Sequence, residues 1–167
     1  MANTFELIAS STAGSGGVSS FDFTSIPSTY TDLCIKFSVR NTSTTTWGTL
    51  TLNGSSSNWS LMNLYGDGTG TGTQNQSVNT FTVIQTNTND TSNTFTNSEL
   101  YIPNYTNSTY KSIQSDQNKE NNATGAYIWL HGMLWSNTAA INQVTLNAVA
   151  NNFAQYSTAY LFGIKSS

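Results

Sequence analysis

Cys34 and its neighbours are the first residues in the chain that could carry out chemistry. From Leu33 to Arg40 ("LCIKFSVR") apolar and polar residues alternate, which places Cys34 and Lys36 on one face of an extended strand. A reactive thiol needs a nearby base or cation to lower its pKa, and Lys36 is the available cation. The only histidine is His131, and nothing in the sequence brings it to the cysteine. We therefore expect Cys34 to lie on the solvent side of a structural strand.

Carboxylates and a glycine-rich stretch are the other candidates for chemistry. Asp116 and Glu120 lie close together in "SDQNKENN", but the surrounding Asn and Lys indicate a loop, whereas glycosidases need two carboxyls facing across a cleft. The stretch "GDGTGTG" from Gly66 lacks the Lys-Ser/Thr of a P-loop and the repeated acids of an EF-hand. A serine triad would need a base and a G-x-S-x-G turn, and the turn is absent from the sequence. We expect no enzymatic activity, no metal and no cofactor.

One aromatic stretch, "AYIWLHGMLW", is apolar on both faces of its expected strand. A strand of this kind is either buried on both faces, or buried on one face and used for contact on the other. The stretch is therefore a candidate for the core or a subunit interface, or for a platform that stacks on sugar rings. No second His or Cys cluster accompanies its histidine, which argues against a metal site. The residues of this candidate stripe are Tyr127, Trp129, His131, Met133 and Trp135, and Ile128, Leu130 and Leu134 share the opposite face.

Composition limits the classes of protein to which the chain can belong. Its 167 residues suit one domain, residues 1–167, and the 8% of charged residues compares with roughly 25% in ordinary soluble domains. The net charge of −3, with only five Lys and Arg, cannot form the basic stripe of a nucleic-acid-binding protein. The start "MANTFELIAS" does not resemble a signal peptide, and no segment approaches the ~20 apolar residues that span a bilayer. We expect a protein that folds in a reducing cytoplasm without contacting nucleic acid or membrane.

The elements that must position these residues are short strands. Stretches with two-residue periodicity, rich in Thr, Val, Ile, Tyr and Phe, follow one another along the chain. Asn53-Gly54 suits a two-residue hairpin, Asp67–Asn79 is expected to be a long exposed loop, and only Asn137–Val144 could form a single helical turn. The sequence thus predicts an all-β, single-domain antiparallel β-sandwich, jelly-roll-like in its connections. The expected strands lie within 5–10, 20–24, 33–40, 48–53, 61–66, 80–86, 96–103, 110–115, 125–135, 141–149 and 156–165.

Four blocks of the sequence resemble virion structural proteins of tailed bacteriophages, a group common in viruses of aquatic bacteria. Together the blocks span nearly the whole chain, in order, but they identify no active site. The resemblance implies a small β-sandwich that is assembled in the host cytoplasm and is located in the virion. The blocks are 5–40, 99–113, 120–146 and 153–164.

Two placements on the particle follow from this resemblance. The first is a capsid decoration (cement) protein, bound to the outer shell in many copies, with the major capsid protein or other virion proteins as partners. It would be a homo-oligomer, with a trimer favoured, and the aromatic stripe would be buried between copies. The alternative is a tail-fibre or receptor-binding module that contacts host glycans. Low charge suits the first placement, because closely spaced copies repel one another little.

Overall fold

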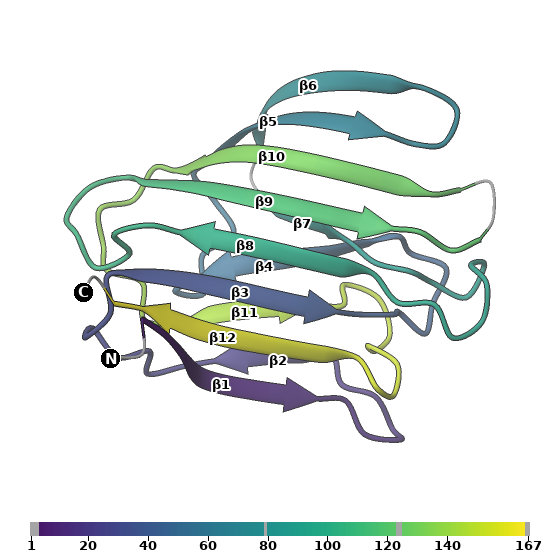
Figure 1. Ribbon diagram of the computed structural model, residues 1–167, viewed down its shortest axis with the longest axis horizontal. Coiled ribbons are helices and arrows are strands. Elements are labelled where there is room, and N and C mark those ends of the chain that lie inside the picture. The colour runs from purple at the N-terminus through teal and green to yellow at the C-terminus, as the bar shows by residue number, and fades with distance from the viewer. Residues whose placement is uncertain (1–3, 79, 123–124, 166–167) are drawn as a thin grey trace.

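The computed structural model describes residues 4–78, 80–122 and 125–165, and within them every regular element is a β-strand. Twelve strands form two antiparallel sheets (Figure 1). The described residues contain no helix that could cross a bilayer. The strands are β1 (Phe5–Thr12), β2 (Ser20–Phe23), β3 (Asp32–Ser38), β4 (Trp47–Leu52), β5 (Trp59–Gly66), β6 (Thr71–Val78), β7 (Phe81–Ile84), β8 (Asn97–Ile102), β9 (Lys111–Lys119), β10 (Tyr127–Trp135), β11 (Val144–Asn147) and β12 (Thr158–Ile164).

Eight of the strands make a jelly roll. Their pairings are nested along the chain: β1 pairs with β12, β2 with β11, β3 with β8 and β4 with β7. Such nesting is what a long antiparallel hairpin produces when it is rolled into two sheets. One sheet thus contains β1-β12-β3-β8 and the other β2-β11-β4-β7. The predicted all-β sandwich with jelly-roll connections is confirmed.

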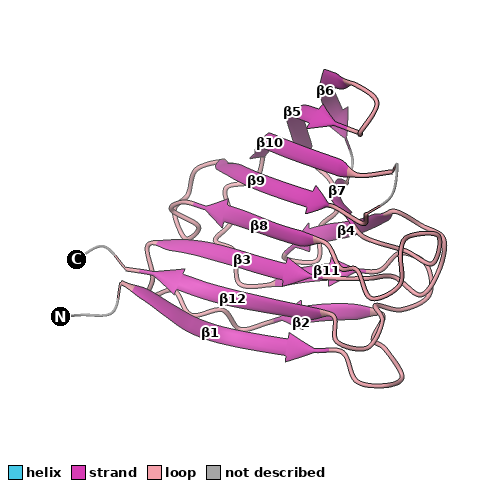
Figure 2. Cartoon of the chain, turned by 45° about the vertical axis from the view of Figure 1, so that its right-hand side comes forward, coloured by secondary structure: helices cyan, strands magenta, loops and turns pink. Residues whose placement is uncertain are grey.

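Two inserted hairpins enlarge one of the sheets. The β5–β6 hairpin lies between β4 and β7 in the chain, and the β9–β10 hairpin lies between β8 and β11. β9 continues the sheet from β8, and β10 then pairs with β5, so the larger sheet has the order β1-β12-β3-β8-β9-β10-β5-β6. Figure 2 shows β5 and β6 at the end of this sheet farthest from β1. The hairpins therefore extend the large sheet beyond the four-stranded sheet.

The core lies between the sheets and is continuous across both. Alternation sets the inward side chains: β4 and β9 each bury every second residue. Phe37 and Leu100 from the large sheet join Leu50 and Phe81 from the small one in a single buried cluster. At the inserted hairpins, the Ile84 amide on β7 donates to Gln117 Oε1 on β9 at 2.7 Å, which ties the two layers together.

The structure departs from the sequence-based expectations around the Asn53-Gly54 turn, in the stretch from Asp67 and at residues 137–144. Asn53 and Gly54 both have positive φ and form the expected tight turn, but β4 pairs with β11 and β7 and not with the strand that follows the turn. The long loop predicted over Asp67–Asn79 is wrong: β6 begins at Thr71 and pairs with β5 along its length, and Asn79 lies outside the described residues. Residues 137–144 contain no helical turn. Thr, Gln and Asn in β6 form a strand because β5 supplies a paired edge, a tertiary effect that propensity misses.

Candidate interaction surface

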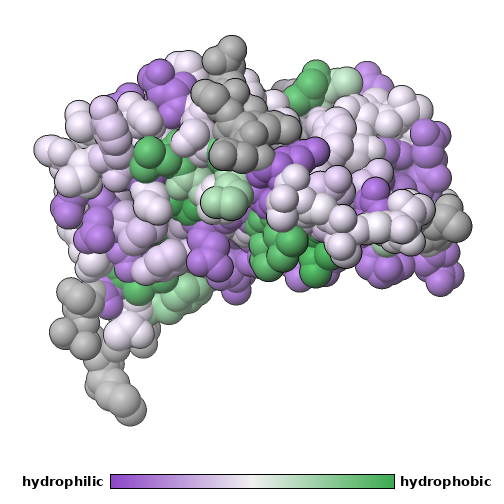
Figure 3. All heavy atoms as spheres, turned by 90° about the horizontal axis from the view of Figure 1, so that it is seen from above, coloured by the Kyte–Doolittle hydropathy of each residue, from purple (hydrophilic) through white to green (hydrophobic). Residues whose placement is uncertain are grey.

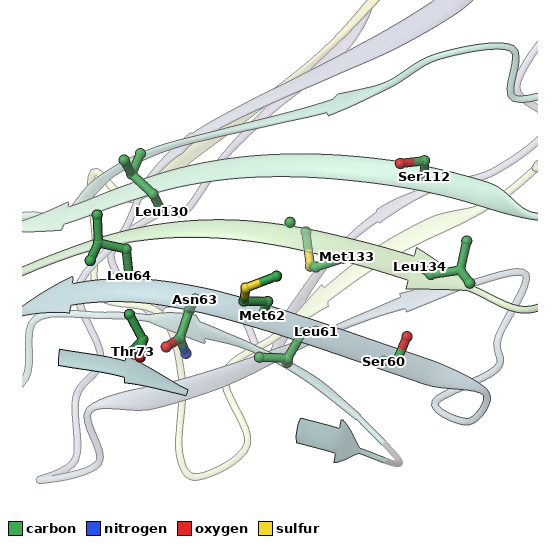
Figure 4. A pocket seen from close by; sticks show the side chains of 11 residues that line it. Ser60, Leu61, Met62, Asn63, Leu64, Thr73, Ser112, Leu130, Met133 and Leu134 are labelled. Atoms are coloured by element: carbon green, nitrogen blue, oxygen red, sulfur yellow. The ribbon is translucent and has the colours of Figure 1, made fainter. Parts of the chain in front are cut away.

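An uncovered apolar patch lies on the outer face of the large sheet, where the two inserted hairpins meet. It consists of Met62 and Leu64 on β5 and Ile128 and Leu130 on β10, which are 62%, 53%, 59% and 48% exposed. Leu64 is directly opposite Leu130, and Met62 is opposite Gly132. In Figure 4, Leu64 and Leu130 project from one side of the sheet while Leu61 and Asn63 project from the other. We call these four residues the apolar patch.

The patch exists because β10 and its partner strand carry apolar residues on both parities. The opposite parity of β5, with Trp59 and Leu61, is buried in the sandwich. On the inner face Trp59 and His131 pack against Phe81 of β7, while the outer face has no covering layer among the described residues. Figure 3, a view onto the molecule from above, shows apolar groups interrupting a mostly polar surface. Contiguous exposed apolar groups on soluble proteins commonly mark interaction sites.

A shallow groove runs along the patch at Gly132. A Cβ atom placed on Gly132 would meet open space, so the missing side chain leaves a hollow between Leu130 and Leu134. The other lining residues include Ser60, Ser112 and Thr73, and none of the side chains lining this groove is charged. An aliphatic, uncharged groove suits apolar side chains of another protein and offers no aromatic face for a sugar ring.

The area left uncovered is large enough to matter energetically. The exposed fractions of the four side chains together amount to about two complete large apolar side chains. Covering such an area would contribute roughly 3–6 kcal/mol. The patch was missed at the level of sequence, although the parity that carries Ile128 and Leu130 was visible there. The sequence leaves the aromatic parity of the same strand open between core, subunit interface and sugar platform, and in the structure that parity faces mostly inward.

The candidate aromatic stripe divides between core and rim. His131, Met133 and Trp135 are buried in the sandwich, so they are closed to any partner or glycan. The Trp135 Nε1 group donates to the Ser57 carbonyl at 3.2 Å, which fixes the indole inside. Tyr127 is half-buried at the end of β10. On this inner side Trp135 packs against Trp59 and His131 packs against Phe81.

An aromatic rim surrounds the half-buried end of the stripe. It consists of Trp47, Tyr65, Tyr127 and Trp129, and Trp129 is its centre. The Trp129 ring lies 5.1 Å from Trp47 and 6.0 Å from Tyr65 between centroids, while Trp47 and Tyr127 are 6.4 Å apart. Trp47 is exposed and the other three residues are half-buried. Tyr127 and Trp129 are thus the two residues of the predicted stripe that solvent reaches in part, while Trp47 and Tyr65 are additions that the sequence did not indicate.

His131 is a buried imidazole without polar support. Neither ring nitrogen has a hydrogen-bond partner among the described residues. Its ring meets Phe81 edge-on at 5.5 Å and lies 5.1 Å from Trp129. Removal from water lowers the pKa of His131 to about 4, because the charged form loses its hydration. The group is therefore neutral at physiological pH, with its orientation set by ring packing.

Cys34 shares the outer face of β3 with exposed Lys36, as expected, but the expectation that solvent reaches it there is wrong, because the residue is buried. The thiol is 1% exposed, because Tyr101 on β8 and Phe162 on β12 stand directly opposite it on the same face. Desolvation and, next, the nearby Glu99 carboxylate raise the pKa of Cys34 to about 12. Lys36 does not activate the thiol, since its Nζ is paired with Glu99 Oε2 at 2.8 Å. The thiol is therefore held protonated and unreactive.

The carboxylates singled out from the sequence have local structural roles. The loop expected around Asp116 is wrong, since Asp116 lies on β9, opposite Glu99 and Leu130, and Glu120 follows the end of that strand. Four residues of extended chain separate them by about 13 Å, which exceeds the roughly 5–9.5 Å of glycosidase pairs. Asp67 Oδ1 accepts bonds from the Thr69 amide and hydroxyl and the Gly70 amide, which lowers the pKa of Asp67 and closes the β5–β6 turn. Among the described residues there is no group of three or more potential metal ligands.

A buried ion pair fixes the loop that follows β7. Lys119 Nζ lies 2.9 Å from Asp90 Oδ2, and both side chains are almost fully buried. Asp90 also accepts bonds from the Asn87 amide and from Asn121 Nδ2.

Searches of the chain against family models and against curated proteins find no match.

Proposed function

We propose that the protein is a structural component of a tailed-bacteriophage virion, a decoration protein that binds the outer shell in many copies through protein–protein contacts. The observation that carries the proposal is the apolar patch, an aliphatic surface with exposed Asp116 beside it that no other described element covers. Decoration proteins need such a surface and need no reactive group. The sequence blocks that resemble phage virion proteins agree with this role, and so does the neutral polar exterior, which limits repulsion between neighbouring copies.

The patch suits attachment because its free energy comes from covering apolar area. A hydrophobic contact keeps its strength at high salt, while contacts between exposed charges weaken. Specific interfaces bury about 1,200–2,000 Å² in total, so the patch would form the centre of the contact and the surrounding Ser and Thr side chains its polar rim. The major capsid protein is the partner that this placement implies.

Copy number and a matched pair of variants test the proposal. In Leu64→Ser/Ile128→Ser, two patch residues become small and polar, and the number of copies per virion should fall sharply. Leu7→Ser is the control, because Leu7 is 55% exposed on the opposite edge of the same sheet and is not part of the patch. Quantitative mass spectrometry of purified virions gives the counts. Hundreds of wild-type copies support shell placement, while a handful, or equal loss in both variants, contradicts it.

A tail-fibre module that contacts host glycans is the second candidate, and the aromatic rim is the observation that favours it. Trp47 is exposed within a cluster of half-buried rings, and sugar rings stack on aromatic faces that solvent can reach. Trp47→Ala should then abolish binding on a glycan array, while Tyr110→Ala, at an exposed tyrosine outside the rim, should leave binding intact. If the wild-type protein binds no glycan on the array, this alternative fails.

A further inference from the structure

Three of the four edge strands in the sandwich are blunted against pairing with another chain. β1 has an irregular register between Leu7 and Ala9 and carries Glu6, which pairs with Lys165 at 3.1 Å. β2 and β7 are only four residues long. β2 also carries Asp22, and the Ile84 amide of β7 is bonded to Gln117. Short length, charge and irregularity are the devices by which natural sheets avoid edge-to-edge association.

The fourth edge strand, β6, shows none of these devices in the part of the chain that the structure describes. It is eight residues long, and its register with β5 is regular from Thr71 to Val78. The segment "TGTQNQSV" contains no charged residue and no proline. β6 is the terminal strand of the large sheet, and Figure 1 shows it at the margin of the molecule, at the end farthest from β1. One edge of the sandwich is therefore long, regular and uncharged.

The absence of charge matters most for pairing between identical strands. A two-fold axis normal to a sheet makes the two edge strands antiparallel and keeps each face of the sheet on the same side. Side chains alternate between the two faces of a sheet, and paired residues must lie on the same face. The residue nearest the axis is therefore paired with the same residue of the second copy. With the axis near the middle of β6, Gln74 is such a residue. No position along β6 would bring like charges together, so a second copy of this strand is an electrostatically acceptable partner.

We propose that two copies of the protein join through β6, in antiparallel pairing about a two-fold axis normal to the large sheet. The two eight-stranded sheets then form one continuous sheet. Because the axis preserves the faces, both apolar patches lie on the same side, with β6 and its copy between them. A pair thus presents two patches in one direction, and two linked contacts hold a common target more tightly than either contact alone.

Charge placed on the β6 edge tests this pairing. Thr73 is exposed on the outer face, so Thr73→Lys and Thr73→Glu should both fold. Each variant brings two like charges near the axis, which should raise the apparent dissociation constant of the dimer about fivefold or more. An equimolar mixture of the two variants should recover the dimer, and the defect of each alone should shrink at high salt. Ser10→Lys and Ser10→Glu, at an exposed position on β1, are the controls and should dimerise like wild type.

Sedimentation velocity over a concentration series provides the measurement. A wild-type dimer that the Thr73 variants weaken and their mixture restores supports the proposal. A protein that stays monomeric at its highest soluble concentration, a trimer, or a dimer unaffected by either Thr73 variant would overturn it. The pairing concerns self-association alone, so its failure would leave the attachment of single copies to a shell untouched.

Discussion

Replacing His131 by Phe should stabilise the protein, and more so as the solution becomes acidic. The imidazole is 2% exposed and surrounded by rings, and its two nitrogens find no hydrogen-bond partner among the described residues. A buried polar group without a partner costs about 1–3 kcal/mol. Phe keeps the edge-on contact with Phe81 and removes the polar atoms. At pH 7.5 we therefore expect the free energy of unfolding to rise by about 1–3 kcal/mol.

The acid-dependent part follows from the pKa of the same group. The folded state holds the pKa of His131 at about 4, whereas the unfolded chain has the ordinary value near 6.5. Between these values the unfolded state binds more protons, so the wild-type protein loses stability as the pH falls below 6.5. By pH 5 this loss amounts to about 2 kcal/mol, and His131→Phe removes it. The advantage of the variant should grow by that amount between pH 7.5 and pH 5.

Urea unfolding at the two pH values, followed by tryptophan fluorescence, measures both effects. The difference between variant and wild type cancels the contributions of carboxylates that titrate in both proteins. His131→Leu serves as a second apolar variant, because Phe is slightly larger than His and some overpacking could offset its gain. The reasoning is refuted if both variants are less stable than wild type at pH 7.5, or if their advantage is the same at the two pH values.

Three further predictions concern other parts of the molecule. Asp90→Ala leaves the buried Lys119 ammonium without its partner, so the free energy of unfolding should fall by about 3–5 kcal/mol. Urea titration measures this loss, and a value below about 1 kcal/mol would contradict the buried pair. Cys34 should resist thiol reagents in the folded protein at pH 8 and react fully in denaturant, and rapid labelling of the native protein would argue against its burial. Gly132→Val should fold with unchanged or higher thermal stability, because a Cβ atom at this position meets open space. By filling the groove, the same variant should weaken the proposed attachment to the shell. Undiminished binding of the variant to the shell would exclude the groove from the contact.

Periodicity was sufficient to predict the architecture. Alternation along β3, β4 and β9 gave strands, and the lack of helical segments excluded parallel crossovers, so an antiparallel sandwich was the remaining solution. The pattern did not predict which strands were inserted hairpins. Nothing in the residues of β5 or β10 shows that these two strands pair with each other and lie outside the jelly roll. Contacts between distant parts of the chain determine this pairing.

The candidate site was predicted less well, for reasons that particular residues show. β10 is apolar on both parities, and alternation alone could not decide whether Trp135 or Leu130 faces the solvent. Ring packing against Trp59 and Phe81 decides it, and those partners come from distant parts of the chain. Cys34 likewise alternates as a polar position, but its cross-strand neighbours are Tyr101 and Phe162, which cover it. Burial on the outer face of a sheet depends on neighbouring strands that sequence order does not reveal.

The nested pairing of strands also determines when the chain can fold during synthesis. In the large sheet the late strand β12 lies between β1 and β3, and in the small sheet β11 lies between β2 and β4. The first strands to leave the ribosome therefore have no neighbours until the last ones emerge. Pairings this distant in sequence form slowly, on the scale of milliseconds to seconds for β-sandwiches. Completion of the sandwich must therefore wait until β12 has left the ribosome, and the apolar residues of the earlier strands must stay in solution without their partners until then.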